Sequence, residues 1–130
     1  MPATAAQSVI AWIALGGAVG SVARYALAGL VQRYTSPYFP YGTFAVNIVG
    51  CLVFGIIFGL TEQRFAISPA MRAFLLIGVL GGFTTFSSYT FESFQLIRDA
   101  EFLRASVNAA GQVLLGLVFF WVGYLVNRWI

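Results

Sequence analysis

Four long stretches of almost uninterrupted apolar residues alternate with short polar segments along the chain. They cover residues 8–31, 41–61, 72–97 and 104–129. Each stretch has roughly the 20 residues that a helix needs to cross the hydrocarbon core of a membrane, which is about 30 Å thick. The polar connections between them are too short to form a domain outside the membrane. The pattern predicts an all-α integral membrane protein in which residues 1–130 form one domain of four transmembrane helices.

The composition gives an independent reason to expect a membrane protein. Hydrophobic residues make up 60% of the chain and charged residues only 8%, whereas soluble globular proteins have about 25% charged residues. The few charges are scattered, so no basic tract exists for a nucleic acid. The chain has no histidine and only four acidic residues, which leaves little for acid–base chemistry or a side-chain metal site. We therefore expect no enzyme and no catalytic residues.

The arginines are distributed almost evenly between the two sides of the membrane. Four spans place both termini on one side, together with three of the seven arginines. The positive-inside rule needs an imbalance to fix the orientation of a membrane protein. The near balance predicts that the chain inserts in both orientations and pairs as an antiparallel, dual-topology homodimer. The three arginines on the side of the termini are Arg64, Arg72 and Arg128, and the opposite four are Arg24, Arg33, Arg98 and Arg104.

The third apolar stretch contains adjacent glycines, Gly81 and Gly82, close to its middle. Glycine weakens a helix, so we expect the third transmembrane helix to be broken near this pair. Broken backbone inside a membrane is tolerated only where it is buried in protein or lines a cavity. It also frees carbonyl oxygens, which are suitable ligands for a small alkali cation. The alternative is that the two glycines only allow close packing against a neighbouring helix.

Polar side chains within the four stretches identify the candidate site, because polar groups in lipid face a helix interface or a watery path. Five of the seven residues from Thr84 to Thr90 are serine or threonine. On the fourth stretch, Asn108 and Gln112 lie four residues apart and share a face. We expect Asn108 to join helices by hydrogen bonding, whereas Asn47 and Gln112 fit either that role or a path.

Arg24 is the only charged residue of the first stretch. Its side chain either extends to the membrane surface or forms an electropositive vestibule that attracts anions. Hydroxyl, amide and guanidinium groups are hydrogen-bond donors, and they outnumber the single in-span acid, Glu92. Aromatic ring edges carry partial positive charge, so Phe86 and Tyr89 add to this set. The residues favour an anion as the substrate without identifying it.

Three motifs on three of the four stretches resemble the Fluc (CrcB) family of fluoride channels. Together with the length and the four-helix plan, the resemblance extends over the whole chain. The motifs are Gly16-Gly17-x-x-Gly20-x-x-x-Arg24-Tyr25, Gly42-Thr43-x-x-x-Asn47-x-x-Gly50, and Gly81-Gly82-Phe83-Thr84-Thr85-Phe86-Ser87-Ser88-Tyr89-Thr90-Phe91-Glu92.

The resemblance implies a fluoride-selective channel in the cell (inner) membrane that passively exports fluoride from the cytoplasm and so relieves fluoride toxicity. It implies an antiparallel homodimer with two pores. It also implies a structural Na⁺ at the dimer interface, held by the backbone carbonyls of Gly81 and Thr84. The pore residues that correspond to those of the family are Asn47, Phe86, Ser87, Ser88, Tyr89 and Gln112, with Glu92 near a pore mouth.

The chain departs from the family pattern on the third and fourth stretches. Tyr89 stands where a second phenylalanine is common, which keeps a ring edge and adds a hydroxyl. Gly116 and Phe120 replace hydroxyl residues that are often found further along the fourth helix. These two replacements leave open how far the polar track continues on that helix.

Two other functions compete with the channel. A coupled exporter that resembles the small multidrug-resistance proteins would also have four helices and dual topology. Such exporters need a membrane-embedded acid in the first helix, where this chain has only Arg24. A non-transporting subunit that only packs helices would have no need for the hydroxyl cluster or the broken helix.

Overall fold

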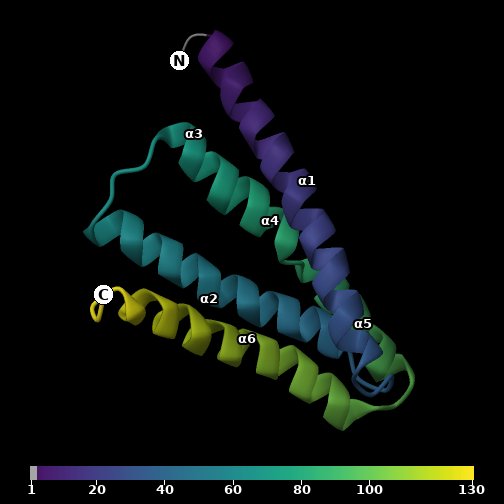
Figure 1. Ribbon diagram of the computed structural model, residues 1–130. Helices are drawn as coiled ribbons and strands as arrows, with labels where there is room; N and C mark the ends of the chain where they lie inside the picture. Colours follow the sequence, from purple (N-terminus) through teal and green to yellow (C-terminus); the bar gives the residue numbers. More distant parts are fainter. Residues whose placement is uncertain (1–2) are drawn as a thin grey trace.

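The computed structural model describes residues 3–130, and its described residues are all helical or in short connections, without any strand. Four helical segments are long and apolar enough to cross a membrane, as predicted, and the chain is a multi-pass membrane protein. Three of them are single helices, and the third segment is divided into four pieces (Figure 1). The elements are α1 (Ala3–Arg33), α2 (Tyr41–Gln63), α3 (Pro69–Arg72), the π-helix η1 (Ala73–Val79), α4 (Leu80–Phe83), α5 (Phe86–Arg98) and α6 (Phe102–Val126).

The third span changes its neighbour halfway along its length. Before the interruption, η1 and α4 pack against α1. After it, α5 packs against α6, which also runs beside α2 over a long interface (Figure 1). The interruption therefore lies where α1, α2, the third span and α6 come together, and it connects two pairs of packed helices.

The interruption itself is at Thr84 and Thr85, which Phe83 separates from the glycine pair. Both threonines have extended backbone, with φ/ψ of −86°/156° and −148°/116°. Gly81 and Gly82 are still helical and belong to α4. The predicted break of the third helix is thus confirmed, and the structure places it two residues beyond Gly82. The preceding π-helix had no signal in the hydrophobic pattern.

Several glycines stand where another helix backbone leaves no room for a side chain. A Cβ at Gly20 would meet the carbonyl of Val79, and one at Gly82 would lie 2.7 Å from the carbonyl oxygen of Gly17. Gly82 is therefore explained by close packing of α4 on α1. Across α2 and α6, a Cβ at Gly123 would meet the carbonyl of Leu52. Such small residues let helices approach closely in lipid, where packing replaces the hydrophobic effect as the driving force.

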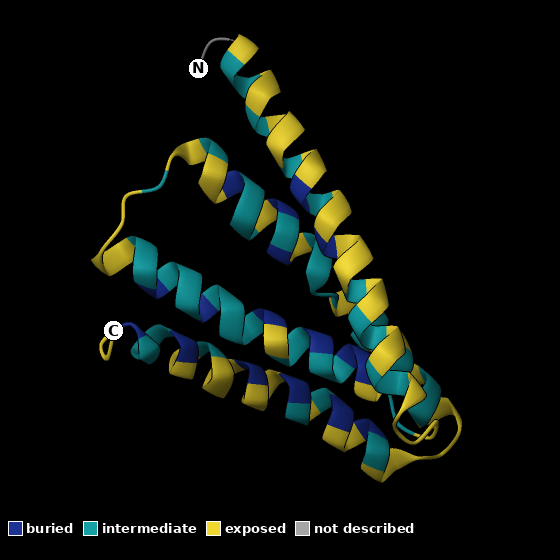
Figure 2. Ribbon diagram, viewed as in Figure 1, coloured by how far each residue is buried: buried dark blue, intermediate teal, exposed yellow. Residues whose placement is uncertain are grey.

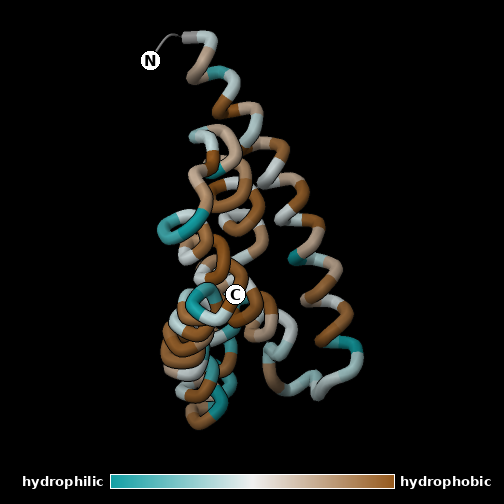
Figure 3. Tube along the Cα trace, turned by 60° about the vertical axis from the view of Figure 1, so that its left-hand side comes forward, coloured by the Kyte–Doolittle hydropathy of each residue, from teal (hydrophilic) through white to brown (hydrophobic). Residues whose placement is uncertain are grey.

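The outward surfaces of the helices are largely apolar. Figure 3 shows hydrophobic residues along all the long helices, and Figure 2 shows that most outward positions of α1 and α6 are exposed. Examples with more than half of their surface exposed are Ile10, Val22, Leu114, Leu117 and Trp121. A surface of this kind is stable in lipid or against another protein, and it is unsuited to water.

We predict that Gly123→Ala lowers the melting temperature of the detergent-solubilised protein, because the added methyl group meets the Leu52 backbone. Overpacking of this kind costs about 1–3 kcal/mol. Gly111→Ala, on the same helix, is the matched control, because its methyl group would meet only the ring of Phe44 at 3.2 Å, which is able to shift. Equal melting temperatures for the two variants would contradict the packing argument.

Candidate functional site

Asn47 of α2 binds the peptide group at the interruption of the third span. Its side-chain Oδ1 accepts a hydrogen bond from the backbone N–H of Thr85 at 2.8 Å, and its Nδ2 donates to the Thr85 carbonyl at 3.1 Å. The side-chain amide thus makes the pair of bonds that a neighbouring peptide would make in regular structure. This pairing satisfies the Thr85 N–H, which would otherwise lack a partner inside the membrane, and gives the Thr85 carbonyl a side-chain donor.

A continuous series of hydrogen bonds extends from Asn47 to α6 and α5. Asn47 Nδ2 donates to Gln112 Oε1 at 2.7 Å, and Gln112 Nε2 donates to Asn108 Oδ1 at 2.8 Å. Asn108 Nδ2 donates to the Ser93 hydroxyl at 2.9 Å. Ser93 in turn donates to the Tyr89 carbonyl at 2.8 Å. We call Asn47, Gln112, Asn108 and Ser93 the polar chain. Asn108 thus joins α6 to α5 by hydrogen bonding, as we expected from the sequence.

Among the backbone carbonyls that lose their normal helical partners at the interruption are those of Gly81 and Thr84. In a helix the Gly81 carbonyl would accept from the N–H of Thr85, but that N–H donates to Asn47. The Thr84 carbonyl would accept from the N–H of Ser88, which donates instead to Thr85 Oγ1 at 3.1 Å. Carbonyl oxygens are hard ligands that suit an alkali cation. The family resemblance implies that these two carbonyls hold Na⁺. The loss of their helical N–H donors leaves both oxygens available for that role. Within residues 3–130, no group of three or more His, Cys, Asp or Glu could provide a side-chain alternative.

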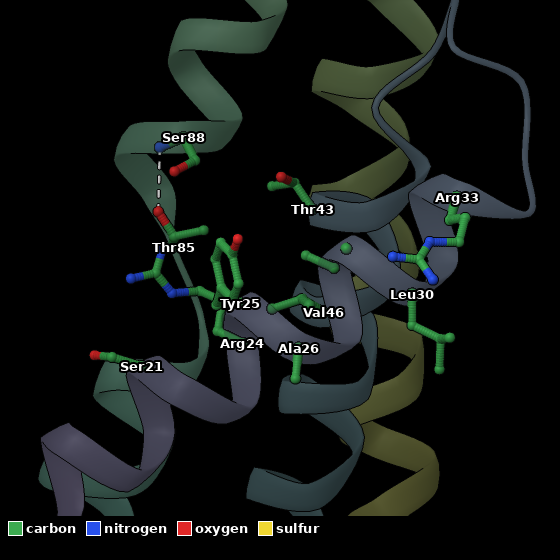
Figure 4. Close-up of a pocket in the computed structure, with 12 residues that line it drawn as sticks. Ser21, Arg24, Tyr25, Ala26, Leu30, Arg33, Thr43, Val46, Thr85 and Ser88 are labelled. Carbon is green, nitrogen blue, oxygen red and sulfur yellow. Dashed lines mark hydrogen bonds between the residues drawn. The ribbon is translucent and has the colours of Figure 1, made fainter.

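Arg24 of α1 is bonded to the backbone of α4, close to the interruption. Its Nε donates to the carbonyl of Gly82 at 3.0 Å. The same side chain lines a cavity of about 540 Å³ between α1, α2 and α5, in which Arg33 lies at a distance from Arg24 (Figure 4). Thr43, Thr85 and Ser88 also line this cavity, and no acidic residue does. Two guanidinium groups without a carboxylate make the cavity electropositive.

A second cavity, of about 290 Å³, contains four of the predicted pore residues. The rings of two of them, Phe86 and Tyr89, have centroids 5.6 Å apart at an interplanar angle of 42°. Phe86 is 77% exposed, so one wall of the cavity is open in the single chain. The four predicted residues are Asn47, Phe86, Tyr89 and Gln112, and the other lining residues are Gly50, Cys51, Phe54, Thr84, Thr85, Val113 and Phe120.

The departures from the family pattern have visible consequences around the second cavity. The Tyr89 hydroxyl donates to the carbonyl of Ala109 on α6 at 2.6 Å, so this group is used to join α5 to α6. Phe120 adds a ring to the cavity wall. Gly116 is packed close to Cys51, where a Cβ would lie 3.2 Å from the sulfur. Beyond Gln112, these two α6 positions contribute no polar side chain.

The remaining predicted site residues lie apart from the second cavity. Ser87 is exposed, with its hydroxyl 3.4 Å from that of Thr85. Ser88 lines the electropositive cavity. Glu92 accepts a hydrogen bond from Thr43 at 2.8 Å through Oε1, and its Oε2 is buried with no hydrogen-bond partner within residues 3–130. The structure therefore divides the predicted residues between two cavities and a carboxylate on α5.

Sequence reasoning did not identify Thr43, Ser93 or the link from Asn108 to Gln112 as parts of the site. Ser93 lies just beyond the hydroxyl-rich run and had one available signal, because it follows Tyr89 by four residues and shares its helix face. Thr43 was part of the motif Gly42-Thr43-x-x-x-Asn47-x-x-Gly50, but no role was predicted for it. Its bond to Glu92 depends on how α2 and α5 pack, which spacing along one helix cannot reveal.

Comparisons with known proteins place the chain in a family. Residues 11–124 match the family described as CrcB-like protein, Camphor Resistance (CrcB). The chain is 49% identical over 119 residues to the fluoride-specific ion channel FluC of Nitratidesulfovibrio vulgaris, with 92% of this chain and 96% of the relative covered. It is 46% identical to the fluoride-specific ion channel FluC of Nitrosococcus oceani, with 92% and 95% covered. The corresponding protein of Geotalea daltonii is also 46% identical, with 95% and 99% covered. The chain belongs to the CrcB family.

Proposed function

We propose that this protein is a fluoride-selective channel that lets fluoride leave the cytoplasm passively across the cell (inner) membrane. The observation that carries the proposal is the set of hydrogen-bond donors around the interruption of the third span, in a family whose curated relatives are named fluoride-specific ion channels. The electropositive cavity offers Arg24 and Arg33, and the second cavity offers the Gln112 amide, which keeps one N–H outside its bond to Asn108. Asn47 holds this amide in place, because it donates to Gln112 and to the Thr85 carbonyl. A small anion that loses water needs such donors to replace its hydration.

The balance of charge within the membrane supports an anion rather than a cation or a proton. Glu92 is the only acid away from the span ends, because Glu62 lies in the last turn of α2, and Glu92 accepts a hydrogen bond from Thr43. α1 (Ala3–Arg33) contains no acid, so a coupled exporter would lack a proton carrier in its first helix. Polar and ionisable groups in a membrane are costly and mark the path of a substrate. Here that path is lined mainly by donors.

We further propose that two copies associate as an antiparallel homodimer. In a single chain the two polar cavities open onto the surface of the helices, and Phe86 beside them is 77% exposed. Polar backbone and side chains cannot face lipid without a large cost. A second copy packed over these openings would remove them from lipid. The near-equal number of arginines on the two sides supports insertion in opposite orientations.

A bound Na⁺ at the centre of this dimer is the third part of the proposal. The carbonyls of Gly81 and Thr84 would hold it, since their helical N–H partners donate to Asn47 and Thr85. Two such carbonyls from each copy would converge if the interruptions lie at the two-fold axis. The cation would compensate oxygens that otherwise have no partner in a dry environment.

The first prediction concerns transport by purified protein in liposomes. We expect rapid efflux of fluoride down its gradient and negligible efflux of chloride, measured with ion-selective electrodes. Protein-free liposomes give the background rate. Proton-dependent uptake of a cationic drug without fluoride efflux would overturn the proposal and favour a coupled exporter.

The second prediction concerns Asn47. Asn47→Asp should reduce fluoride efflux about a hundredfold, since a charge at the centre of a membrane span costs about 2.5–3.5 kcal/mol and this one repels the anion. Asn47→Ser is the matched variant, because it also removes the amide but adds no charge, and it should keep more flux than Asn47→Asp. Gel filtration in detergent shows whether both variants remain folded. Undiminished efflux through folded Asn47→Asp would remove Asn47 from the path.

A further inference from the structure

We infer that Ser93 is a positioning residue: its hydroxyl determines which way the amide of Asn108 faces, and through Asn108 it holds the Nε2 of Gln112 in place. This inference rests on the proposed channel function, because it concerns how the donors of the second cavity are oriented. Ser93 is 8% exposed and Asn108 is fully buried. Neither residue lines the second cavity, so any effect they have on an anion there passes through Gln112.

The orientation of the Asn108 amide depends on the Ser93 hydroxyl, which has a single hydrogen. Ser93 donates that hydrogen to the Tyr89 carbonyl at 2.8 Å. Toward Asn108 its oxygen is therefore able only to accept. Asn108 consequently presents Nδ2 to Ser93, at 2.9 Å, and its Oδ1 is left for Gln112. A reversed Asn108 would bring its carbonyl oxygen against the Ser93 oxygen with no hydrogen between them.

The same logic continues from Asn108 to the cavity. Gln112 turns Nε2 to Asn108 at 2.8 Å and Oε1 to Asn47 at 2.7 Å. Asn47 then turns its own Nδ2 toward Gln112 and its Oδ1 toward the N–H of Thr85, at 2.8 Å. Apart from the Asn47 N–H that returns to the Thr85 carbonyl, the donors follow one direction, from the Thr85 N–H at one end to the Tyr89 carbonyl at the other. Because both ends are backbone groups of fixed position, only one orientation of the three amides satisfies all the bonds.

This arrangement decides which atoms are available to an anion. One of the two hydrogens on Gln112 Nε2 is used by Asn108, and the other takes no part in the polar chain. If Asn108 were free to reverse, Gln112 would lose the acceptor that holds its Nε2, and its amide would be held only at Oε1, by Asn47. A buried polar network that is fully satisfied fixes one arrangement, and a partly satisfied one does not.

Ser106 provides a matched control for Ser93. Its hydroxyl also donates to the carbonyl four residues earlier, that of Phe102, at 2.8 Å. It is exposed and lies on α6, and the polar chain does not include it. Alanine at either position removes the same kind of bond to the helix backbone, but only Ser93→Ala removes the acceptor of Asn108.

The test measures fluoride efflux from liposomes for the wild type and for Ser93→Ala, Ser93→Thr and Ser106→Ala. Loss of one orienting hydrogen bond, typically about 1 kcal/mol, predicts that Ser93→Ala lowers efflux about fivefold. Ser106→Ala should match the wild type, and Ser93→Thr, which keeps the hydroxyl, should restore most of the flux. Equal efflux from Ser93→Ala and Ser106→Ala would overturn the inference.

A double-mutant cycle separates positioning from a general effect on the fold. If Ser93 acts through Asn108, Ser93→Ala should cause no further loss of efflux in an Asn108→Leu background, whereas independent effects would multiply. Multiplied losses would overturn the inference. If Asn108→Leu does not fold, the comparison of Ser93→Ala with Ser93→Thr still decides. Absence of fluoride efflux from the wild type would instead contradict the proposed function.

Discussion

The rest of this structure depends on one constraint: where a membrane helix is interrupted, each backbone group that loses its partner must find another or be kept away from lipid. At Thr84 and Thr85 the third span becomes extended, and side chains from three elements supply the missing bonds. Asn47 binds the Thr85 peptide, Thr85 caps α5 through the N–H of Ser88, and Arg24 binds the Gly82 carbonyl. The helices are held in place around the break by these bonds as well as by their packing.

The same bonds occupy N–H groups at the interruption and leave backbone carbonyl oxygens there without their helical donors. The N–H groups of Thr85 and Ser88 are consumed by side-chain oxygens, so the carbonyls of Gly81 and Thr84 lose their usual partners. An excess of oxygens at the interruption suits a cation. The side chains around it donate N–H groups: Arg24 to the Gly82 carbonyl, Asn47 to Gln112, and Gln112 to Asn108. One break in a helix thereby leaves carbonyl oxygens without helical partners and gathers N–H donors within a few residues of each other.

Hydrophobic pattern alone was sufficient to predict the four spans, because a membrane requires about 20 apolar residues for each crossing. The break in the third helix was also predictable, but the residues at which it occurs were predicted only approximately. Gly82 has a second reason to be glycine, since it packs against the backbone of Gly17, and the extended residues are two threonines that Asn47 stabilises from another helix. The role of Ser93 could not be predicted either. It depends on the third span, which packs on α1 before the interruption and on α6 after it. Contacts between distant helices have no signature in local spacing.

Tyr89 helps to fix the position of α5 relative to α6 beside the second cavity. Its ring lies in the second cavity beside that of Phe86, its carbonyl accepts the last bond of the polar chain from Ser93, and its hydroxyl donates to Ala109. Each of these contacts constrains α5 relative to α6, and α6 also carries Gln112. A shift of α5 that moved the aromatic edge would therefore also disturb the bonds that orient the amides. The hydroxyl that distinguishes this tyrosine from phenylalanine is used to hold the wall of the cavity in place, while the ring itself lines that cavity.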